Sequence, residues 1–366
     1  MGIKTFIKKY CPQSLLPLLK TPYHRMKIRI IEERAKKYLP YYQDELSREI
    51  LNDRIEYLKS GDKSIFLKRA EKSGMHFYHI YDVKEGHDMY EDKYSGFIVI
   101  YDQDSMELEY TKKLLKMCKY LPKYRFYRLD DFMKNCDVSD SELIVMNLRH
   151  EDMKRLEEYL SERKICNDTV TYIVAVRKDL QYLEMFSPAE NETIIDAGCF
   201  NGATALRFIK WGGEKVRRVY TFEFDPVNIA RCEKNLRGHE DIVKLVKKGT
   251  WDKDEVMYTN PNGSGGSSVY SEGSIEINLT SIDNVVKDDA VTFIELDVEG
   301  AELRTLKGAR NTIIKHHPRL AISAYHKPED IYELPEYILS LVPEYKFYMR
   351  HYSSREWETV LYASVN

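Results

Sequence analysis

The stretch "TIIDAGCFNGATALRFI", residues 193–209, decides the fold of this chain. Its apolar run ends at Asp196, glycines follow at Gly198 and Gly202, and apolar residues then recur at helical spacing. A buried strand, a tight turn and an amphipathic helix explain all three features. In an open α/β sheet such a turn lies beyond the carboxyl end of a strand, where nucleotide-like ligands bind against backbone amides.

The charge of this loop indicates which ligand it suits. A dinucleotide fingerprint begins with a glycine that lets the pyrophosphate approach, whereas this loop begins with Asp196. A carboxylate repels a pyrophosphate and attracts a ligand with positive charge. S-adenosylmethionine (SAM) carries a sulfonium and an amino group but no phosphate, so the loop favours SAM over NAD. A strand, turn and helix without any ligand is the alternative that the motif alone leaves open.

Two later strand ends complete the predicted cofactor site. The segment "RRVYTFEFDP" places Glu223 twenty-seven residues after Asp196, where a carboxylate can accept both ribose hydroxyls. Its Asp225 is better explained as the N-cap of a helix that begins at Pro226. The segment "KKGTWD" then offers an aromatic face and backbone groups for adenine, with core packing of Trp251 as the alternative. The predicted cofactor contacts are Asp196, Gly198, Phe200, Asn201, Gly202, Glu223, Phe224, Gly249, Thr250 and Trp251.

Strands and helices alternate through the C-terminal half. The expected strands are 193–196, 216–223, 242–247, 291–297 and 319–324, and helices begin near residues 202, 226, 300 and 328. Residues 345–364, "YKFYMRHYSSREWETVLYAS", predict an antiparallel hairpin. A mostly parallel α/β sheet that ends in such a hairpin is, by analogy, the Rossmann-like layout of class I SAM-dependent methyltransferases.

Longer segments carry a family resemblance. "IELDVEGAELRTLKGA" at 294–309, "HHPRLAISAYHKPEDIYELPEYI" at 316–338 and the closing hairpin resemble the FkbM family of SAM-dependent methyltransferases. The resemblance covers roughly residues 180–364 and includes the cofactor positions Asp196, Gly198, Gly202 and Glu223. It implies methyl transfer from SAM, commonly to a hydroxyl oxygen of a sugar or a secondary metabolite. It does not identify the acceptor.

Two residues at strand ends are catalytic candidates. Asp297 ends "VTFIELD", and His326 follows "LAISAY". We expect His326 to accept the hydroxyl proton, because a neutral imidazole titrates near neutral pH. Asp297 is expected to hold the substrate, the cofactor's amino group or His326. A divalent-metal site of Asp297, Glu299 and His326 is an alternative that the spacing does not demand, so no metal ligand is assigned, and Glu302 is expected to be solvated or ion-paired.

The chain divides into three predicted regions. Residues 1–75 form a basic helical N-terminal region, 76–180 a small α/β domain without a glycine-rich loop, and 181–366 the SAM-dependent methyltransferase domain. In the small domain we expect strands at 97–101, 124–129, 142–148 and 169–174, alternating with helices at 111–121 and 150–163. No glycine occurs in "YDQDSME" after the first of these strands, so we expect no dinucleotide there.

Charge and composition restrict the partners. A net charge of −3 argues against nucleic-acid binding, no apolar run reaches the ~18 residues of a membrane span, and six cysteines without CxxC pairs suit a cytoplasmic protein. Residues 1–38 carry ten Lys or Arg against two acids. They form either a basic segment that contacts a partner or the inner face of the membrane, or a helical arm packed on its own protein. The glycine–serine patch at 260–268 is either a lid or a surface turn.

Together these patterns predict an O-methyltransferase that acts on a hydroxyl of a sugar, glycan or nucleotide-sugar precursor. A small-molecule O-methyltransferase of secondary metabolism and a SAM-binding scaffold without turnover are the alternatives. The number of copies in the assembly is left open, with a homo-oligomer allowed.

Overall fold

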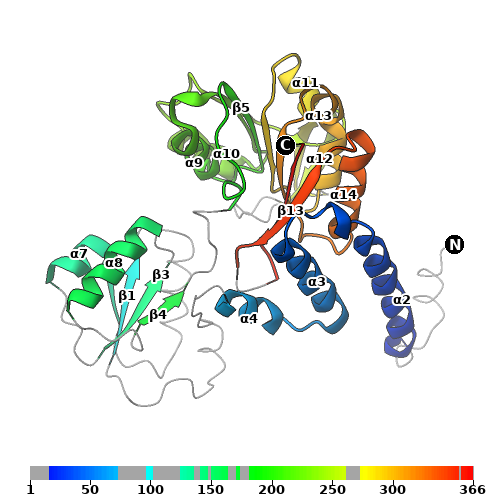
Figure 1. Ribbon diagram of the computed structural model, residues 1–366. Coiled ribbons are helices and arrows are strands. Elements are labelled where there is room, and N and C mark those ends of the chain that lie inside the picture. Colours follow the sequence, from blue (N-terminus) through cyan, green and yellow to red (C-terminus); the bar gives the residue numbers. More distant parts are fainter. Residues whose placement is uncertain are drawn as a thin grey trace. The chain divides into compact units, whose positions relative to one another are not determined.

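The chain folds into two compact units (Figure 1). The computed structural model describes residues 16–72, 96–101, 124–135, 141–146, 150–163, 170–173, 181–260, 273–353 and 356–365. The first unit combines residues up to Asp62 with Tyr182–His351 and Trp357–Asn366, and the second holds Lys63–Gln181 and Tyr352–Glu356. The N-terminal helices up to Asp62 therefore belong to the same compact unit as residues 182–351. The sequence had instead suggested a separate region that ends at residue 75.

A seven-stranded sheet forms the centre of the first unit, in the order β13-β14-β12-β11-β5-β6-β7. Its strands are β5 (Glu192–Ala197), β6 (Val216–Phe222), β7 (Val243–Val246), β11 (Phe293–Leu296), β12 (Arg319–Ser323), β13 (Lys346–His351) and β14 (Thr359–Ser364). The five strands from β12 to β7 pair in parallel, and β14 is antiparallel to both β12 and β13. The predicted fold class, a mostly parallel sheet with a C-terminal antiparallel hairpin, is confirmed.

The helices of the methyltransferase region begin close to the predicted residues. They are α9 (Ala203–Gly212), α10 (Pro226–Asn235), α11 (Ile282–Val286), α12 (Glu302–Gly308), α13 (Arg310–His316) and α14 (Asp330–Leu341). Two neighbouring residues determine where α10 begins. Asp225 accepts a hydrogen bond from the Val227 backbone, and Pro226 occupies the first turn. The interpretation of Asp225 as a capping residue is confirmed.

A small second sheet was not predicted. It joins β8 (Gly249–Thr250), β9 (Glu255–Thr259) and β10 (Ile275–Thr280) in the order β8-β10-β9. A two-residue strand such as β8 has no periodicity to detect, and only its pairing with Leu279 and Thr280 defines it. The patch at 260–268 that suggested a lid lies outside the described residues after Asn260.

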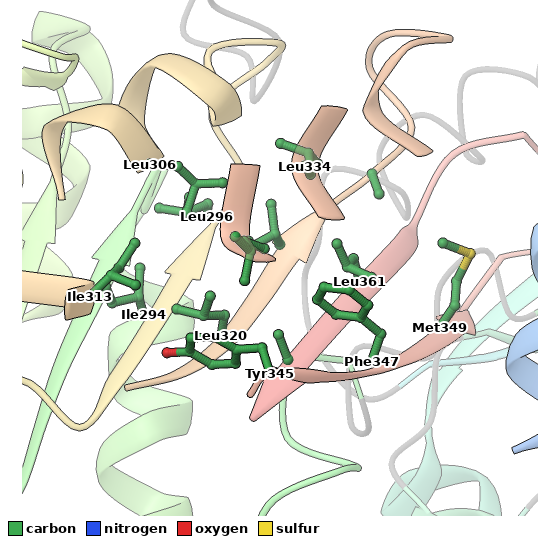
Figure 2. Close-up of a cluster of buried hydrophobic side chains, with 14 of the residues drawn as sticks. Ile294, Leu296, Leu306, Ile313, Leu320, Leu334, Tyr345, Phe347, Met349 and Leu361 are labelled. Atoms are coloured by element: carbon green, nitrogen blue, oxygen red, sulfur yellow. The ribbon is translucent and has the colours of Figure 1, made fainter. Parts of the chain in front are cut away.

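The large sheet has two chemically different faces, because successive side chains of a strand point in opposite directions. Figure 2 shows the apolar face, where Ile294 and Leu296 of β11 pack with Leu320, Leu361 and side chains of α12 to α14. On the opposite face Phe293 packs edge-on against aromatic rings that include Phe208 of α9. Further along β11, that same face carries Glu295. The apolar face holds the core, and the other face leads to the polar groups of the site.

The N-terminal helices pack on this unit. Residues Ile28, Ile31 and Ala35 of α2 (Leu16–Lys36) are buried in the same hydrophobic core as the sheet. In α3 (Glu45–Ser60), the Ser47 hydroxyl accepts a hydrogen bond from the backbone of Met349 in β13. From Ile28 onward the arm is therefore packed on its own protein. Its first 15 residues lie outside the described part, so contact with a membrane or a partner stays a prediction.

The second unit contains a four-stranded parallel sheet, as predicted. Its order is β2-β1-β3-β4, with β1 (Gly96–Tyr101), β2 (Tyr124–Arg128), β3 (Ser141–Met146) and β4 (Val170–Ile173), and with helices α4 (Ser64–Lys72), α7 (Leu129–Asn135) and α8 (His150–Glu162). The residues after Tyr101, where we expect no dinucleotide, and the predicted helix at 111–121 lie outside the described residues. Among the helices that are described in either unit, none is long and apolar enough to cross a membrane.

Candidate functional site

The loop between β5 and α9 has the backbone that its glycines predicted. Gly198 and Gly202 both have positive φ angles, +90° and +82°, and Phe200 between them also lies in the left-handed region at 55°. A Cβ on Gly198 would lie 2.9 Å from the carbonyl carbon of Asp297 and closer still to its oxygen. Only glycine permits this approach, because the added atom would collide with backbone. The loop is thereby held directly against Asp297.

Asp196 lies in a polar row that crosses three neighbouring strands. Strand register places it beside Thr221 of β6 and Glu295 of β11, and all three are buried. The Thr221 hydroxyl donates to Asp196 Oδ2 at 2.5 Å, and the Glu295 carboxyl also forms a side-chain hydrogen bond with Asp196. Burial raises the pKa of Asp196 to about 6, and burial together with the neighbouring Asp196 raises that of Glu295 far above its usual range.

Glu223 follows β6 on the same edge of the sheet and is 6% exposed. Its Oε1 accepts hydrogen bonds from the backbones of Phe224 at 2.7 Å and Asp225 at 2.8 Å, which fixes the carboxylate at the strand end. Burial nevertheless raises the pKa of Glu223 to about 7, because the loss of solvation outweighs these donors. The structure therefore places this carboxylate where the sequence predicted an acceptor for ribose hydroxyls.

The predicted adenine-side residues are brought together only in part. A Cβ on Gly249 would lie 3.0 Å from the ring of Phe224, so these two residues pack against each other. The hydroxyls of Thr250 and Thr305 form a hydrogen bond of 2.8 Å, which indicates a structural role for Thr250. Arg304 lies over the Trp251 ring, 5.5 Å from its centroid. Contact of Thr250 and Trp251 with a cofactor stays a prediction.

In the remainder of the loop, Asn201 is used for local structure. Its side-chain Oδ1 accepts from the Ala203 backbone at 3.0 Å, and its carbonyl accepts from Asn235 of α10 at 2.9 Å. The Phe200 ring lies under the guanidinium of Arg231, 5.6 Å away. These contacts hold the loop in shape, together with hydrogen bonds from the backbones of Gly198 and Cys199 to the Phe222 carbonyl.

These residues fit a cationic cofactor. Asp196 is a buried carboxyl at the end of β5, and Glu223 is a second buried carboxyl at the end of β6. Asp196, whose pKa is raised only to about 6, is ionised at neutral pH, so the potential near the loop favours a positively charged group. SAM would be held by Asp196 near its sulfonium and amine and by Glu223 at its ribose.

Asp297 lies at the centre of the second part of the site, directly after β11. The Tyr182 hydroxyl donates to its Oδ2 at 2.9 Å, and the Tyr325 hydroxyl donates to its Oδ1 at 3.3 Å. Burial raises the pKa of Asp297, while the neighbouring His326 and the Tyr182 hydroxyl act in the opposite direction. The side chains of Asp297 and His326, both predicted at strand ends, lie close together, with Asp297 Oδ1 3.7 Å from His326 Nε2.

His326 is surrounded by carboxylates, which changes its expected protonation. Its Nδ1 is 2.7 Å from Glu302 Oε1, and its Nε2 is 3.6 Å from Glu299 and 3.7 Å from Asp297. Burial alone would lower its pKa, but the carboxylates of Glu299, Glu302 and Asp297 raise the pKa of His326 to about 11. The expectation of a neutral imidazole at working pH is therefore wrong, because these carboxylates favour the imidazolium form of the ring.

Glu302 was expected to be solvated or ion-paired, and the solvated alternative is wrong. Its side chain is fully buried, and its Oε1 also accepts from the backbones of Val298 at 3.2 Å and Gly300 at 3.3 Å. Sequence reasoning also missed Tyr182 and Tyr325. Tyr325 could have been predicted, because it precedes the candidate histidine directly in the sequence. Tyr182 could not, because it is 115 residues from Asp297 in the chain and only folding brings the two together.

The cluster around His326 also contains side chains of the kinds that bind metal ions. In the part of the chain that the structure describes, one group of acidic and histidine side chains could hold a metal ion: Asp297, Glu302 and His326. Each of these side chains offers one ligand atom within 4.8 Å of the others.

Comparison with known proteins identifies the domain that contains the site. Residues 196–349 match the family model described as the methyltransferase FkbM domain. No curated protein sequence matches the chain. Among solved structures, methyltransferase FkbM from Methylobacillus flagellatus KT is similar, at 19% identity over 81% of this chain and 98% of that one, with a TM-score of 0.43. Fibrillarin from Aeropyrum pernix with bound S-adenosyl-L-methionine matches at 11% identity over 49% of this chain and 68% of that one, with a TM-score of 0.33.

Proposed function

Because residues 196–349 form an FkbM methyltransferase domain, and the protein is thus a SAM-dependent methyltransferase, we propose that it methylates a hydroxyl group of a sugar, glycan or nucleotide-sugar precursor. The observation that carries the proposal is the contact between Gly198 and Asp297. It sets the cofactor loop directly against a cluster of acid–base groups. A hydroxyl acceptor needs such a cluster, because its proton must be removed as the methyl group arrives.

The groups around Asp297 support a polyhydroxyl acceptor. The Asp297 carboxylate is hydrogen-bonded to the hydroxyls of Tyr182 and Tyr325. Two charged side chains, Glu299 and His326, lie beside it. Neighbouring hydroxyls of a sugar can donate to these carboxylates and to the tyrosine oxygens. An acceptor with one isolated hydroxyl would leave some of these polar groups unpaired, which costs binding free energy.

In the proposed reaction the protein aligns the acceptor and takes up its proton. When bound, SAM supplies a methyl group on a cationic sulfur, which departs as a neutral thioether. Asp297 receives the proton of the acceptor hydroxyl as the new carbon–oxygen bond forms, and its raised pKa makes it a stronger base than a solvated carboxylate. Alignment of the oxygen accounts for up to about 7–11 kcal/mol of the barrier in well-oriented systems. The His326 cation, held by Glu302, stabilises the ionised form of Asp297.

Acceptor profiling tests the proposal. Purified protein is incubated with SAM and with sugar, nucleotide-sugar or small phenolic acceptors, and S-adenosylhomocysteine is measured. Turnover with sugar-type acceptors is the expected result. Turnover limited to phenols would favour the small-molecule alternative. Cofactor binding without turnover on any acceptor would favour the scaffold.

The pH dependence of cofactor binding tests the role of Glu223. The ionised carboxylate is the better acceptor for ribose hydroxyls, and its pKa is about 7 in the free protein. Affinity for S-adenosylhomocysteine should therefore rise about tenfold between about pH 6 and about pH 8, as measured by calorimetry. The stability of the free protein should change in the opposite direction. A carboxyl whose pKa is raised on folding contributes stability at low pH that is lost as the pH rises through 7.

A Glu223→Gln variant provides the comparison. It should bind the cofactor more weakly than the wild type at high pH, and its affinity should lose the dependence on pH in this range. Asp225→Asn is not a suitable control, since that residue caps α10. Asp241→Asn, an exposed change beyond the same helix, should retain the wild-type profile. An identical rise of affinity in Glu223→Gln would remove Glu223 from the ribose site.

A further inference from the structure

We propose that Asp297, Glu299 and His326 bind one divalent cation of the magnesium–manganese class, with Glu302 as the residue that orients the imidazole. The part played by this ion in methyl transfer rests on the proposed function, but the binding of the ion does not.

The first observation is an imidazole nitrogen without a hydrogen bond in a buried position. The His326 side chain is 9% exposed, and its Nε2 has no hydrogen-bond partner. On the other side of the ring, Nδ1 lies 2.7 Å from Glu302 Oε1. A carboxylate that accepts from one imidazole nitrogen fixes the ring, which is the usual support of a histidine that binds metal. The ion would displace the proton of Nε2 to solvent and bind the lone pair that this exposes.

The second observation is the spacing around Nε2. The nearest carboxylate oxygens are Glu299 Oε2 at 3.6 Å and Asp297 Oδ1 at 3.7 Å. A charge-assisted hydrogen bond would draw such atoms to about 2.7–2.9 Å. Two ligands on one ion, each about 2.1 Å from it, are instead separated by about 3.0–3.7 Å for angles between about 90° and 120°. The nitrogen is therefore at ligand spacing from each oxygen and beyond the hydrogen-bond range. The side chains whose ligand atoms all lie within 4.8 Å of one another are Asp297, Glu302 and His326, so Glu299 must turn toward the ion to complete the proposed set.

The third observation is uncompensated charge. Asp297, Glu299 and Glu302 surround one imidazole, and the buried Asp330 adds a fourth carboxylate close by. The ammonium of Lys327 donates to the Gly300 carbonyl. A single imidazolium leaves this group with excess negative charge in a partly buried site, where unpaired charge is costly. A divalent cation removes that cost.

The ligand set indicates the kind of ion. Two carboxylates with one imidazole, no thiolate and room for water suit hard cations such as Mg²⁺ and Mn²⁺. The Asp297 and Glu299 side chains are 28% and 29% exposed, so the remaining positions are open to water or to an acceptor hydroxyl. An ion there would hold the acceptor oxygen and lower the pKa of its hydroxyl, while the proton still passes to a carboxylate of the cluster.

The test is a titration of the full chain, freed of metal by a chelator, with Mn²⁺ alone. Electron paramagnetic resonance of free Mn²⁺ gives the number of bound ions and their affinity. We expect one site whose affinity falls at least tenfold in His326→Ala and in Glu299→Gln. Glu302→Gln, which changes the group that orients the ring, should weaken binding by about 10–100-fold. Asp288→Asn, a change at a fully exposed acid of the same unit, should leave the affinity unchanged.

A spectroscopic signature separates the proposed ligand role from a structural one. Spin-echo modulation of bound Mn²⁺ should show one coordinated imidazole nitrogen in the wild type and none in His326→Ala. If that variant does not fold, Glu299→Gln still tests the affinity, because its side chain is not part of the core. Absence of a Mn²⁺ site, or an equal affinity in these variants and the wild type, would overturn the proposal.

Failure of this inference and failure of the proposed function give different results. Methyl transfer that persists at full rate in chelator, without a Mn²⁺ site, would reject the ion and retain the methyltransferase. Binding of Mn²⁺ through His326 in a protein that transfers no methyl group to any hydroxyl would retain the ion site and reject the proposed function.

Discussion

Replacing Gly198 by alanine is expected to remove cofactor binding and to destabilise the seven-stranded sheet. The new Cβ would be 2.9 Å from the carbonyl carbon of Asp297 and closer to its oxygen, so β11 or the loop must move. The positive φ of +90° adds strain for any residue with a side chain. Together, overpacking and strain should cost about 3–5 kcal/mol. The expected results are a lower midpoint of thermal unfolding and at least a hundredfold loss of affinity for S-adenosylhomocysteine.

Gly238→Ala is a matched control for this prediction. Gly238 has nearly the same backbone angle, a φ of +87°, but an added Cβ would meet nothing within 4 Å. This variant should show the strain alone, about 1–2 kcal/mol, and normal cofactor affinity. Equal effects of the two substitutions would mean that the contact with Asp297 has no importance of its own.

Replacing Asp297 by asparagine is expected to reduce turnover by about 10²–10⁴-fold, the usual contribution of a positioned base. The amide oxygen still accepts a tyrosine hydroxyl, so the shape of the site is largely kept, but the group no longer takes up a proton. Steady-state kinetics should show a large fall in kcat, with S-adenosylhomocysteine affinity within a few-fold of the wild type.

The control for this second prediction is Asp288→Asn, which changes a carboxylate at the surface paired with Lys315. It should leave turnover and cofactor affinity unchanged. Normal turnover in Asp297→Asn would show that proton removal occurs elsewhere or is unnecessary. A loss of cofactor affinity equal to the loss of turnover would instead place Asp297 at the cofactor.

Much of the fold was predictable because its signals are local. Apolar runs located the parallel strands to within one or two residues, and Asp225 with Pro226 marked the start of α10. Pattern reasoning did not find β8, β9 and β10, since short strands acquire their definition from partners distant in the chain. Nor did it group α2 and α3 with the large sheet, because their apolar stripes show only that some surface is buried.

The candidate site divides in the same way. Asp196, Glu223, Asp297 and His326 were found because each lies at the end of a strand, and parallel strands bring their carboxyl ends to one edge. The protonation of His326 was predicted incorrectly, because it depends on three carboxylates whose distances appear only in the folded chain.

By itself, therefore, the sequence determined the class of fold, the acidic glycine loop and the strand ends that carry the reactive groups. Hydrophobic periodicity and turn chemistry act over a few residues and are readable without a structure. Tertiary structure alone decided that Tyr182 bonds to Asp297, that Glu302 is buried behind His326, and that one imidazole nitrogen faces two carboxylates without a hydrogen bond. The reason is physical: burial and separation set the strength of electrostatic interactions, and both arise only when distant segments pack together.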